Sequence, residues 1–341
     1  MFPQKPKRFT IAVDVMSGDN DPEISLGALS NVLDQYKDID FLIFGLKEKL
    51  DIALKNYTKL HGLRVIYCEK IVGSADKPST ALRNSKDTSM RMAVEYVKEG
   101  KADAVISSGN TGALMAISRS VLGMLQNVYR PAIIASIPTI KGKPVALVDS
   151  GANAEVNERM FFEFAVMGEA FARIAFNCPS PRVALLNIGV EDIKGKEIIK
   201  SSLNYIKENS KLNIVGYIEG NSILEHDADV VVTDGFTGNI VLKTMEGTAK
   251  LCEHFLKMGF RSSIFARIGY LFARKSLKST FTKIDKRSYN GAMLVGLNGI
   301  VVKSHGSADE VAFEAALKTV IGLVRDDINA KISQDLKLAN T

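Results

Sequence analysis

Four short segments of glycine and small polar residues are the strongest candidates for chemistry in this chain. Each follows a run rich in valine or isoleucine and precedes a helical pattern. They are SSGNTGA (107–113), DSGAN (149–153), DGFTGN (234–239) and SHGSADE (304–310). Glycine lets a ligand approach the backbone closely, and the N–H groups at a helix start bind anions. One such segment is also what an ordinary turn and helix cap need. Four together favour an anion site.

The last segment contains both a structural pattern and a chemical group. Ser307 and Glu310 have the spacing of a capping box, which predicts a helix N-terminus there. His305 lies two residues earlier, so we expect it at the mouth of the same crevice. A single histidine more often has a structural role, but this one adjoins the predicted anion site.

Familiar cofactor and nucleophile motifs are absent from the sequence. Neither GxGxxG nor GxxxxGK[ST] occurs, which argues against NAD and ATP. GxSxG is absent as well, which weakens a covalent acyl-enzyme mechanism. Asp14, Asp19 and Asp21 have the chemistry to hold Mg²⁺, but the stretch 18–22 is also typical of a turn, and we favour the turn. We therefore expect neither a cofactor nor a metal.

Short apolar runs alternate with helical patterns along the chain. Nine runs read as strands: 9–14, 40–45, 63–68, 103–109, 131–138, 144–151, 182–189, 212–220 and 229–235. Most are continuously apolar, and they are separated by helical patterns such as 85–99, 157–176 and 307–326. Buried strands joined by helices indicate a mostly parallel, doubly wound α/β sheet covered on both faces. The carboxyl ends of such strands form the ligand crevice.

The composition fits one large globular α/β domain over residues 1–341. The 341 residues are 46% hydrophobic, and no linker or repeat divides them. The three cysteines have no disulfide or zinc spacing, so a reducing cytoplasm fits best. The apolar start is too short for a secretory signal, and no run of about 20 apolar residues predicts a membrane span.

The positive charge is concentrated in one excursion, residues 251–286. This segment has eight basic and two acidic residues, a net +6 that equals the net charge of the whole chain. Its apolar residues follow helical spacing, with two arginines along one edge: Ile264, Phe265, Ile268, Leu271 and Phe272, flanked by Arg267 and Arg274. This pattern differs from a nucleic-acid groove. It suits an amphipathic helix lying on an anionic membrane surface or packed against the protein's own core or a second subunit.

Six motifs in order resemble one known family. They are DVMSGDNDP, SSGNTGALM, DSGAN, NIGVEDIKG, DVVVTDGFTGNIVLK and SHGSAD. Over nearly its whole length the chain resembles the bacterial phosphate acyltransferases of the PlsX type. Ser17 replaces a usual glycine and Val190 a usual acidic residue. The resemblance implies a homodimeric three-layer α/β/α enzyme, related in fold to phosphate acetyltransferases and isocitrate-type dehydrogenases.

The resemblance also implies a reaction, partners and a location. The enzyme would convert acyl-acyl-carrier protein (acyl-ACP) and inorganic phosphate to acyl phosphate and free ACP, for phospholipid synthesis. It would be cytoplasmic, bound peripherally to the inner face of the membrane, and would pass acyl phosphate to a membrane glycerol-3-phosphate acyltransferase. Rival hypotheses are a phosphate acetyl- or butyryltransferase acting on acyl-CoA, a metal-dependent dehydrogenase of related fold, and a non-catalytic membrane scaffold.

Direct attack of phosphate on a thioester needs alignment and oxyanion stabilisation rather than a cofactor. We expect Lys194 to neutralise charge, as the family motif favours, Asp234 to orient a donor or accept a proton, and His305 to protonate the departing thiolate. The predicted substrate-binding residues are Asn110, Thr111, Gly112, Asn153, Thr237, Gly238, Asn239 and Ser307. In the two glycine loops at 110–112 and 237–239, backbone N–H groups would hold phosphate, with the asparagine and threonine side chains as further donors.

Overall fold

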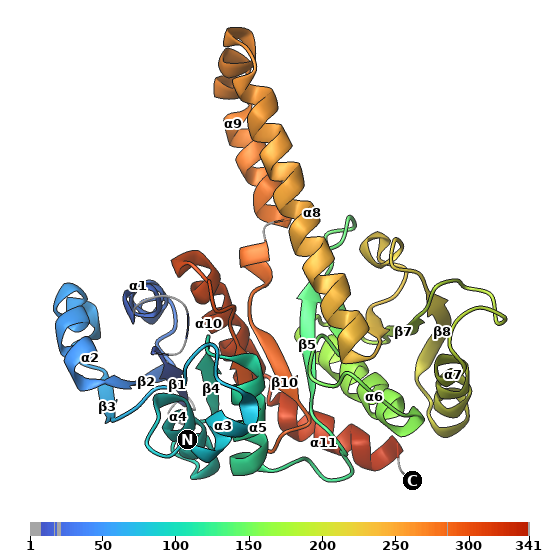
Figure 1. The fold of residues 1–341 in the computed structure, drawn as a ribbon, viewed down its shortest axis with the longest axis horizontal. Helices are drawn as coiled ribbons and strands as arrows, with labels where there is room; N and C mark the ends of the chain where they lie inside the picture. Colours follow the sequence, from blue (N-terminus) through green and yellow to red (C-terminus); the bar gives the residue numbers. More distant parts are fainter. Residues whose placement is uncertain (1–7, 17, 19–21, 285, 340–341) are drawn as a thin grey trace, which may run out of the picture.

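A computed structural model describes residues 8–16, 18, 22–284 and 286–339 of the chain. Its frame is an eleven-stranded sheet with the order β3-β2-β1-β4-β11-β10-β5-β6-β9-β7-β8 (Figure 1). The strands are β1 (Phe9–Asp14), β2 (Ile39–Leu46), β3 (Arg64–Cys68), β4 (Ala104–Ser107), β5 (Ala132–Ile137), β6 (Val145–Val148), β7 (Arg182–Leu186), β8 (Asn213–Ile218), β9 (Val230–Val232), β10 (Ala292–Val295) and β11 (Ile300–Lys303).

The sheet consists of two parallel groups that meet at antiparallel strands. β3, β2, β1, β4 and β11 pair in parallel, as do β6, β9, β7 and β8. Between the groups, β10 and β5 are antiparallel to both of their neighbours. The mostly parallel sheet is confirmed, and all nine predicted strands are present. β10 and β11 are additional strands that the sequence analysis did not predict.

Helices cover both faces of the sheet, which confirms the three-layer α/β/α architecture (Figure 1). The helices are α1 (Pro22–Leu33), α2 (Lys47–Ala53), α3 (Pro78–Arg83), α4 (Ser89–Lys98), α5 (Thr111–Leu122), α6 (Glu158–Ala175), α7 (Glu197–Asn209), α8 (Gly235–Arg261), α9 (Ile264–Ile284), α10 (Glu310–Arg325) and α11 (Ile328–Ala339). The largest core cluster packs α1, α6, α10 and α11 against one face. α4 and α5, with the base of α8, cover the other.

The apolar character of α6 explains why it is central to the core. Phe161, Phe164 and Phe171 are at most 2% exposed, because apolar residues occupy nearly the whole circumference of this helix. Asn157 ends the preceding loop and accepts a hydrogen bond from Met160 N, which fixes the start of the helix. The predicted helix at 157–176 is therefore confirmed within one residue at either end.

α8 and α9 form a hairpin that projects from the body (Figure 1). The 27 residues of α8 give a length of about 40 Å at 1.5 Å per residue. The excursion predicted at 251–286 is thus the outer part of a longer structure, since α8 begins on the sheet at Gly235. Within the described part of the chain, no helix has the length and apolar character needed to span a membrane.

Candidate active site

All four glycine segments contribute to one cavity of about 2230 Å³. Thr111, Ser150, Asn239 and the stretch 304–309 line it, although they follow strands that lie far apart in the sequence. Ile133, Ala135 and Ile137 of β5 form an apolar wall, and α8 forms the opposite one with residues such as Leu242 and Met245. The cavity therefore joins a polar end, built from strand-end loops, to an apolar groove.

The segment after β4 caps α5 with its own asparagine. Asn110 Oδ1 accepts a hydrogen bond from Ala113 N at 3.0 Å. Its Nδ2 donates to the carbonyl oxygens of Ser74 and Asp76. The Asn110 amide is thus engaged in local contacts, and its role as a phosphate donor stays a prediction. Thr111 lies on the cavity wall at the first residue of α5, whereas Gly112 packs against Pro78 and leaves no room for a Cβ.

The start of α8 uses most of its polar groups internally. Asp234 Oδ1 accepts from Thr237 N at 2.8 Å, and Asp234 Oδ2 accepts from the Thr237 hydroxyl at 2.8 Å. Gly238 N donates to the Asp234 carbonyl oxygen. Thr237 and Gly238 thus take part in capping the helix, and their contacts with phosphate stay a prediction. Asn239 does reach the cavity.

Asp149 organises the loop after β6. Its buried carboxylate accepts hydrogen bonds from the backbone N–H groups of Ile133, Gly151, Ala152 and Asn153 and from the Asn153 side chain, at 2.7–3.2 Å. Burial raises the pKa of Asp149, while these donors favour the ionised form and oppose that shift. Ser150 and Gly151 are thereby held on the cavity wall. Asn153 is buried and donates to Pro131 O as well, so it shapes the loop rather than contacting the cavity.

His305 lies at the polar end of the cavity, as predicted, with a defined proton position. Ser307 N donates to its Nδ1 at 3.2 Å, so in the neutral ring the proton is on Nε2. Asn290 Oδ1 accepts from His305 N, which fixes the backbone of this loop. Asp309, not Ser307, caps α10 by accepting from Ala312 N. The predicted capping box is wrong, because Ser307 contacts His305 instead.

Lys194 lies apart from this arrangement, and of the predicted acidic cluster only Asp14 is among the described residues. Lys194 is not among the residues that line the cavity; it pairs with Glu191 at 2.9 Å on the loop after β7. That ion pair raises the pKa of Lys194. Asp14 is buried and accepts from the Ser107 hydroxyl at 2.8 Å. Asp19 and Asp21 lie outside the described residues, and the residues that are described contain no His, Cys, Asp and Glu cluster suited to a metal.

Lys303 and Asn290 are cavity residues that the sequence analysis missed. Lys303 ends β11, and Asn290 precedes β10. Asn290 Nδ2 donates to the Ser304 hydroxyl at 2.8 Å and to Ala312 O at 2.9 Å, so it ties the 304–309 segment to α10. The run IVVK at 300–303 was the available signal, since it resembles the other buried strands but is only four residues long.

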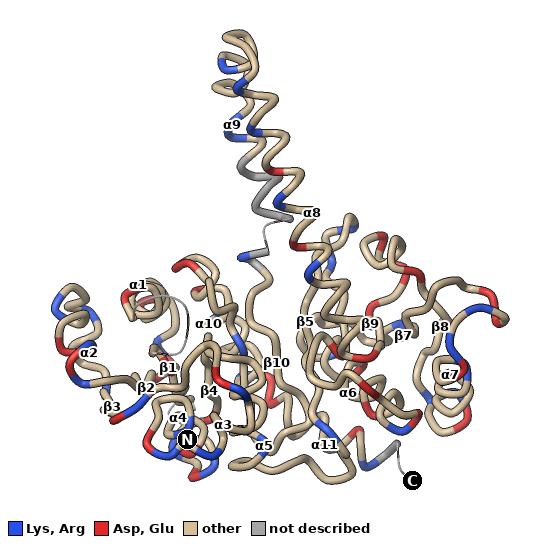
Figure 2. The backbone as a smooth tube through the Cα atoms, in the orientation of Figure 1, with Lys and Arg blue, Asp and Glu red and all other residues tan. Residues whose placement is uncertain are grey.

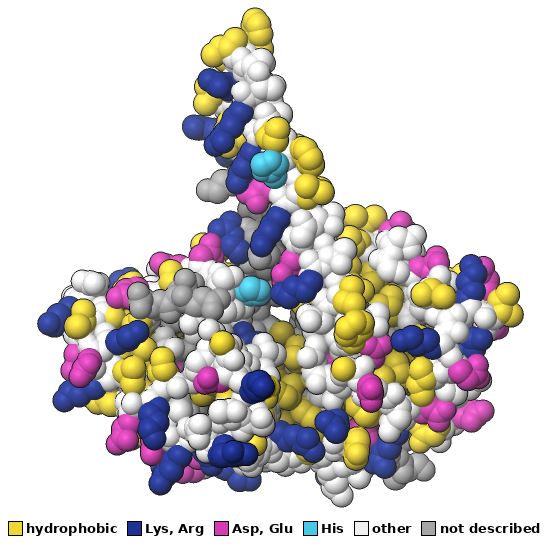
Figure 3. All heavy atoms as spheres, in the orientation of Figure 1, with side chains coloured by type: hydrophobic (Ala, Val, Ile, Leu, Met, Phe, Trp, Pro, Cys, Tyr) yellow, Lys and Arg dark blue, Asp and Glu magenta, His cyan; other side chains and the backbone are white. Residues whose placement is uncertain are grey.

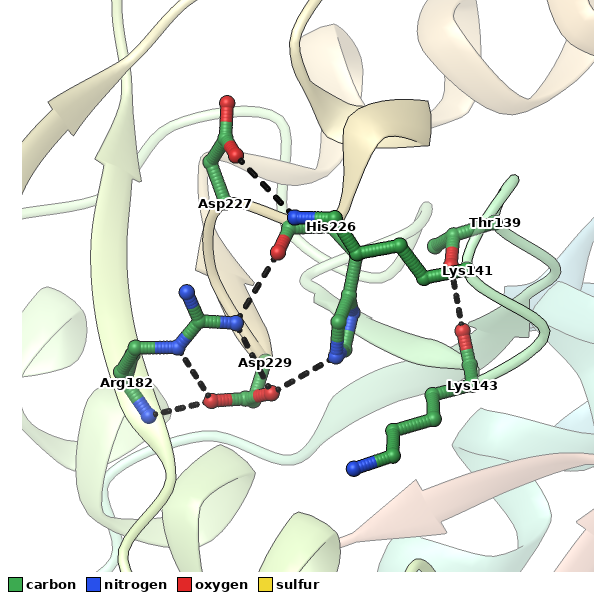
Figure 4. A network of polar contacts seen from close by, with 7 residues as sticks. All are labelled: Thr139, Lys141, Lys143, Arg182, His226, Asp227 and Asp229. Atoms are coloured by element: carbon green, nitrogen blue, oxygen red, sulfur yellow. Dashed lines mark hydrogen bonds and ion pairs between the residues drawn. The ribbon is translucent and has the colours of Figure 1, made fainter.

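A polar network lies beside the turn that carries Leu224, a residue of the cavity wall (Figure 4). Arg182 binds Asp229 through its backbone N and its Nε, at 2.8 and 3.0 Å, which ties the start of β7 to β9. The other Asp229 oxygen contacts His226 Nε2 at 3.1 Å. His226 ends the 3₁₀ turn Ile223–Glu225, whose Leu224 lines the cavity. The network therefore has a structural role: it holds β7, β9 and this turn together.

The hairpin exposes apolar and basic surface together. Phe265 and Phe272 are 81% and 86% exposed, and Ile264, Ile268 and Leu271 are exposed beside them. Arg267, Leu271 and Arg274 also line the outer end of the cavity. Basic residues dominate this part of the chain (Figure 2), and hydrophobic side chains gather at the tip and along one side (Figure 3). The predicted stripe is thus helical and exposed.

Fold comparisons find solved structures with the same architecture. A branched-chain phosphotransacylase from Enterococcus faecalis aligns with a TM-score of 0.60 and 16% identity, over 93% of this chain and 99% of that one. A phosphotransacetylase from Staphylococcus aureus aligns with a TM-score of 0.58 and 15% identity, over 94% of each chain. At these identities the likeness defines the fold: a three-layer α/β/α protein of the phosphotransacetylase type.

Sequence comparisons define the family more closely. The fatty acid synthesis protein family matches residues 9–331. A phosphate acyltransferase from Legionella pneumophila (strain Paris) is 43% identical over 97% of this chain and its own full length. One from Ehrlichia canis (strain Jake) is 45% identical, over 96% of this chain and 98% of its own. The chain belongs to the phosphate acyltransferase family and is an acyltransferase with phosphate as the acyl acceptor.

Proposed function

We propose that the chain transfers a fatty acyl group from acyl-ACP to inorganic phosphate, forming acyl phosphate for phospholipid synthesis. The observation that carries this proposal is the convergence of four strand-end loops on one cavity with an apolar groove. The loops provide donors for an anion, and the groove between β5 and α8 provides a surface for an acyl chain. No residue in this arrangement has to become covalently acylated.

The reaction needs a phosphate oxygen to attack the thioester carbonyl carbon. A C–O bond forms, the carbonyl oxygen becomes an oxyanion, and the C–S bond then breaks. Asn239 on α8 and the first turn of α5 at Thr111 face the cavity and would hold phosphate and oxyanion. The proton that hydrogen phosphate loses on attack would pass to His305, and the protonated ring, with the Ser307 hydroxyl beside Nδ1, would give the proton on Nε2 to the leaving thiolate. The products are acyl phosphate and free carrier thiol.

The apolar groove favours a fatty acyl chain over an acetyl group. Ile133, Ala135 and Ile137 line it from β5, and Leu242 and Met245 line it from α8. Removing a chain from water stabilises its binding by about 0.8 kcal/mol for each buried CH₂ group. A short acyl group would leave this surface without a partner. The groove therefore supports the long-chain substrate and argues against acetyl or butyryl transfer.

The hairpin supports the proposed homodimer. On α8, Phe236, Ile240, Leu251, Phe255 and Met258 are 50–64% exposed and share one helical face. A helical hairpin with so much apolar surface is stabilised when a second hairpin packs on it. We therefore assign this α8 face to a second copy of the chain.

The α9 stripe supports contact with an anionic membrane. Its exposed phenylalanines, Phe265 and Phe272, lie near the tip, and Arg267 and Arg274 are placed to meet lipid headgroups. Membrane contact would bring acyl phosphate to a membrane glycerol-3-phosphate acyltransferase at the cytoplasmic face. Nucleic acid has no part in this proposal, because the basic residues accompany an apolar stripe rather than a stacking surface.

A comparison of donors tests the proposed substrate. Purified protein would be given palmitoyl-ACP, palmitoyl-CoA and acetyl-CoA at equal concentrations, each with and without phosphate. We expect phosphate-dependent loss of the thioester, with the highest kcat/KM for palmitoyl-ACP and the lowest for acetyl-CoA. A preference for acetyl-CoA would instead support a phosphate acetyltransferase. Equal rates with palmitoyl-ACP and palmitoyl-CoA would contradict the proposal that ACP is the carrier. They would still support a long acyl chain as the transferred group.

A further inference from the structure

Lys303 is a half-buried lysine on the wall of the cavity, at the point where β11 ends. In the parallel pairing of β11 with β4, it lies opposite Ser107, the first residue of the segment that leads into α5. Its side chain therefore extends from the same sheet end as the polar loops. Neither the proposed function nor the predicted site assigns it a role.

The ammonium group is held beside the start of α5. Lys303 Nζ donates to the carbonyl oxygen of Ser108 at 3.2 Å and also to that of Ser304. Ser108 is three residues before Thr111, and Ser304 is next to His305 in sequence. The charge is thus fixed between the two loops that bring Thr111 and His305 to the cavity, on the same wall.

Its position distinguishes Lys303 from other cations near the cavity. Lys243 lies on α8, and Arg287 lies in the short turn Lys286–Tyr289 before β10. Lys194, which the family motif favoured for charge neutralisation, is not a lining residue. The two carbonyl oxygens hold the Lys303 ammonium group at the polar end, where the strand-end loops converge. A phosphate dianion needs a fixed cation at such a place, since its binding removes two charges from water.

We propose that Lys303 binds the phosphate acceptor and neutralises its charge during attack on the thioester. This inference rests on the proposed function. Phosphate would lie between Lys303 and the first turn of α5, within reach of Thr111, with the thioester carbonyl on the side of Asn239. The role predicted for Lys194 would then belong to Lys303. The lysine makes no covalent bond and transfers no proton.

The test compares Lys303→Met and Lys303→Arg with wild type, and with Lys98→Met as a matched lysine on the exposed surface of α4. Steady-state kinetics would give separate KM values for phosphate and for the acyl thioester. We expect Lys303→Met to raise the phosphate KM by about 10- to 100-fold, the usual effect of losing a charged hydrogen bond. The thioester KM should stay near wild type, Lys303→Arg should be intermediate, and Lys98→Met should match wild type.

KM separates this role from a structural one, because it does not depend on how much of the protein is folded. If Lys303 only supports two carbonyl groups, Lys303→Met will melt at a lower temperature but keep the wild-type phosphate KM, which overturns the inference. If Lys303→Met has no measurable turnover, the rise in Tm caused by phosphate shows whether the variant still binds phosphate. A cooperative melt without that rise supports the assignment, and a wild-type rise contradicts it.

The experiments also distinguish a wrong proposed function from a wrong role for Lys303. Wild type would then show no phosphate-dependent loss of thioester, whatever Lys303 does. In that case the phosphate-induced rise in Tm still tests the anion site, since it needs no acyl donor. Loss of this rise in Lys303→Met, but not in Lys98→Met, would keep the binding assignment, whereas equal rises in all proteins would end it.

Discussion

Gly238 of α8 lies directly against the carbonyl oxygen of Asp149, so close that a Cβ on Gly238 would come within 1.9 Å of that oxygen. This contact joins the loop after β6 to the first turn of α8. The next residue in α8, Asn239, lies across from Gly151 on the cavity wall. The close approach of two backbones therefore sets where Asn239 stands relative to the polar end of the cavity.

Gly238→Ala should impair both stability and turnover. The added methyl group has to push α8 away from Asp149, and overpacking of this kind costs about 1–3 kcal/mol. A displacement of about 1 Å at Asn239 would lower kcat by roughly 100-fold. Gly322→Ala is the matched control, because a Cβ added to Gly322 in α10 would enter open space, with no neighbouring side chain within 4 Å. Equal activity in both variants would show that the contact does not position the site.

His305→Gln should slow acyl transfer by about 10²- to 10⁴-fold, the usual contribution of a positioned acid. The reason is the loss of the imidazole ring that carries a proton on Nε2 to the leaving thiolate. The loss should be much smaller with an acyl thiophenyl ester, because its thiolate leaves without protonation. Rapid-quench rates for alkyl and aryl thioesters would show the difference. The same loss for both would mean that His305 does not protonate the leaving group.

Ile268→Glu should release the protein from anionic vesicles at physiological salt. The change removes an inserted side chain worth about 1.5–3 kcal/mol, which is a factor of about ten to a hundred in binding, and adds a charge that the lipids repel. Acyl transfer in solution should be unchanged. Ile52→Glu on α2 is the control, since Ile52 is 65% exposed but far from the hairpin in sequence. Co-sedimentation of the folded Ile268 variant at the wild-type level would assign the stripe to protein contacts.

His226 predicts how stability depends on pH. Burial lowers the pKa of His226 below its ordinary value, and the Asp229 carboxylate only partly opposes this. As pH falls below about 6.5, the unfolded chain binds a proton before the folded one does. Stability from this group is therefore present above about pH 6.5 and is lost at lower pH. Thermal melts between about pH 5.5 and 7.5 should show Tm falling towards acid.

His226→Asn should flatten that dependence. Asparagine tolerates the left-handed backbone of this position, where φ is +60°, better than most residues. It cannot titrate, so the part of the slope due to His226 disappears, while loss of the contact with Asp229 costs about 1 kcal/mol at neutral pH. A variant with the full wild-type slope would place the titrating group elsewhere.

The sequence was sufficient for the fold class and for the loops at the strand ends, but not for β10 and β11. Buried strands and the helices between them follow local hydrophobic patterns. The glycine segments mark turns, which also depend on neighbouring residues only. The directions of β5, β6 and β10 could not be predicted, because antiparallel pairing depends on long-range contacts. Asn110 was expected to donate to phosphate, and Asp234 to orient a donor or accept a proton. Both side chains also cap helices, a role that the sequence alone does not separate from substrate contact.

Lys194 and Lys303 show that the sequence alone also does not indicate which lysine lines the cavity. The family motif drew attention to Lys194, while Lys303 lies at the end of a four-residue strand with no recognisable motif. Which lysine lines the cavity depends on where β7 and β11 lie in the sheet, and β11 is next to β4 although about 200 residues separate them in the chain. The spacing of residues in the sequence does not indicate that β11 lies next to β4.

Trapping of the acyl phosphate tests the central claim most directly. Wild-type protein would be mixed with palmitoyl-ACP, with or without phosphate, and quenched into hydroxylamine to convert acyl phosphate to a hydroxamate. We expect hydroxamate in proportion to the thioester lost, only when phosphate is present, and much less of it from Asn239→Ala. Release of free palmitate at the same rate without phosphate would contradict the claim that phosphate attacks the thioester in this cavity.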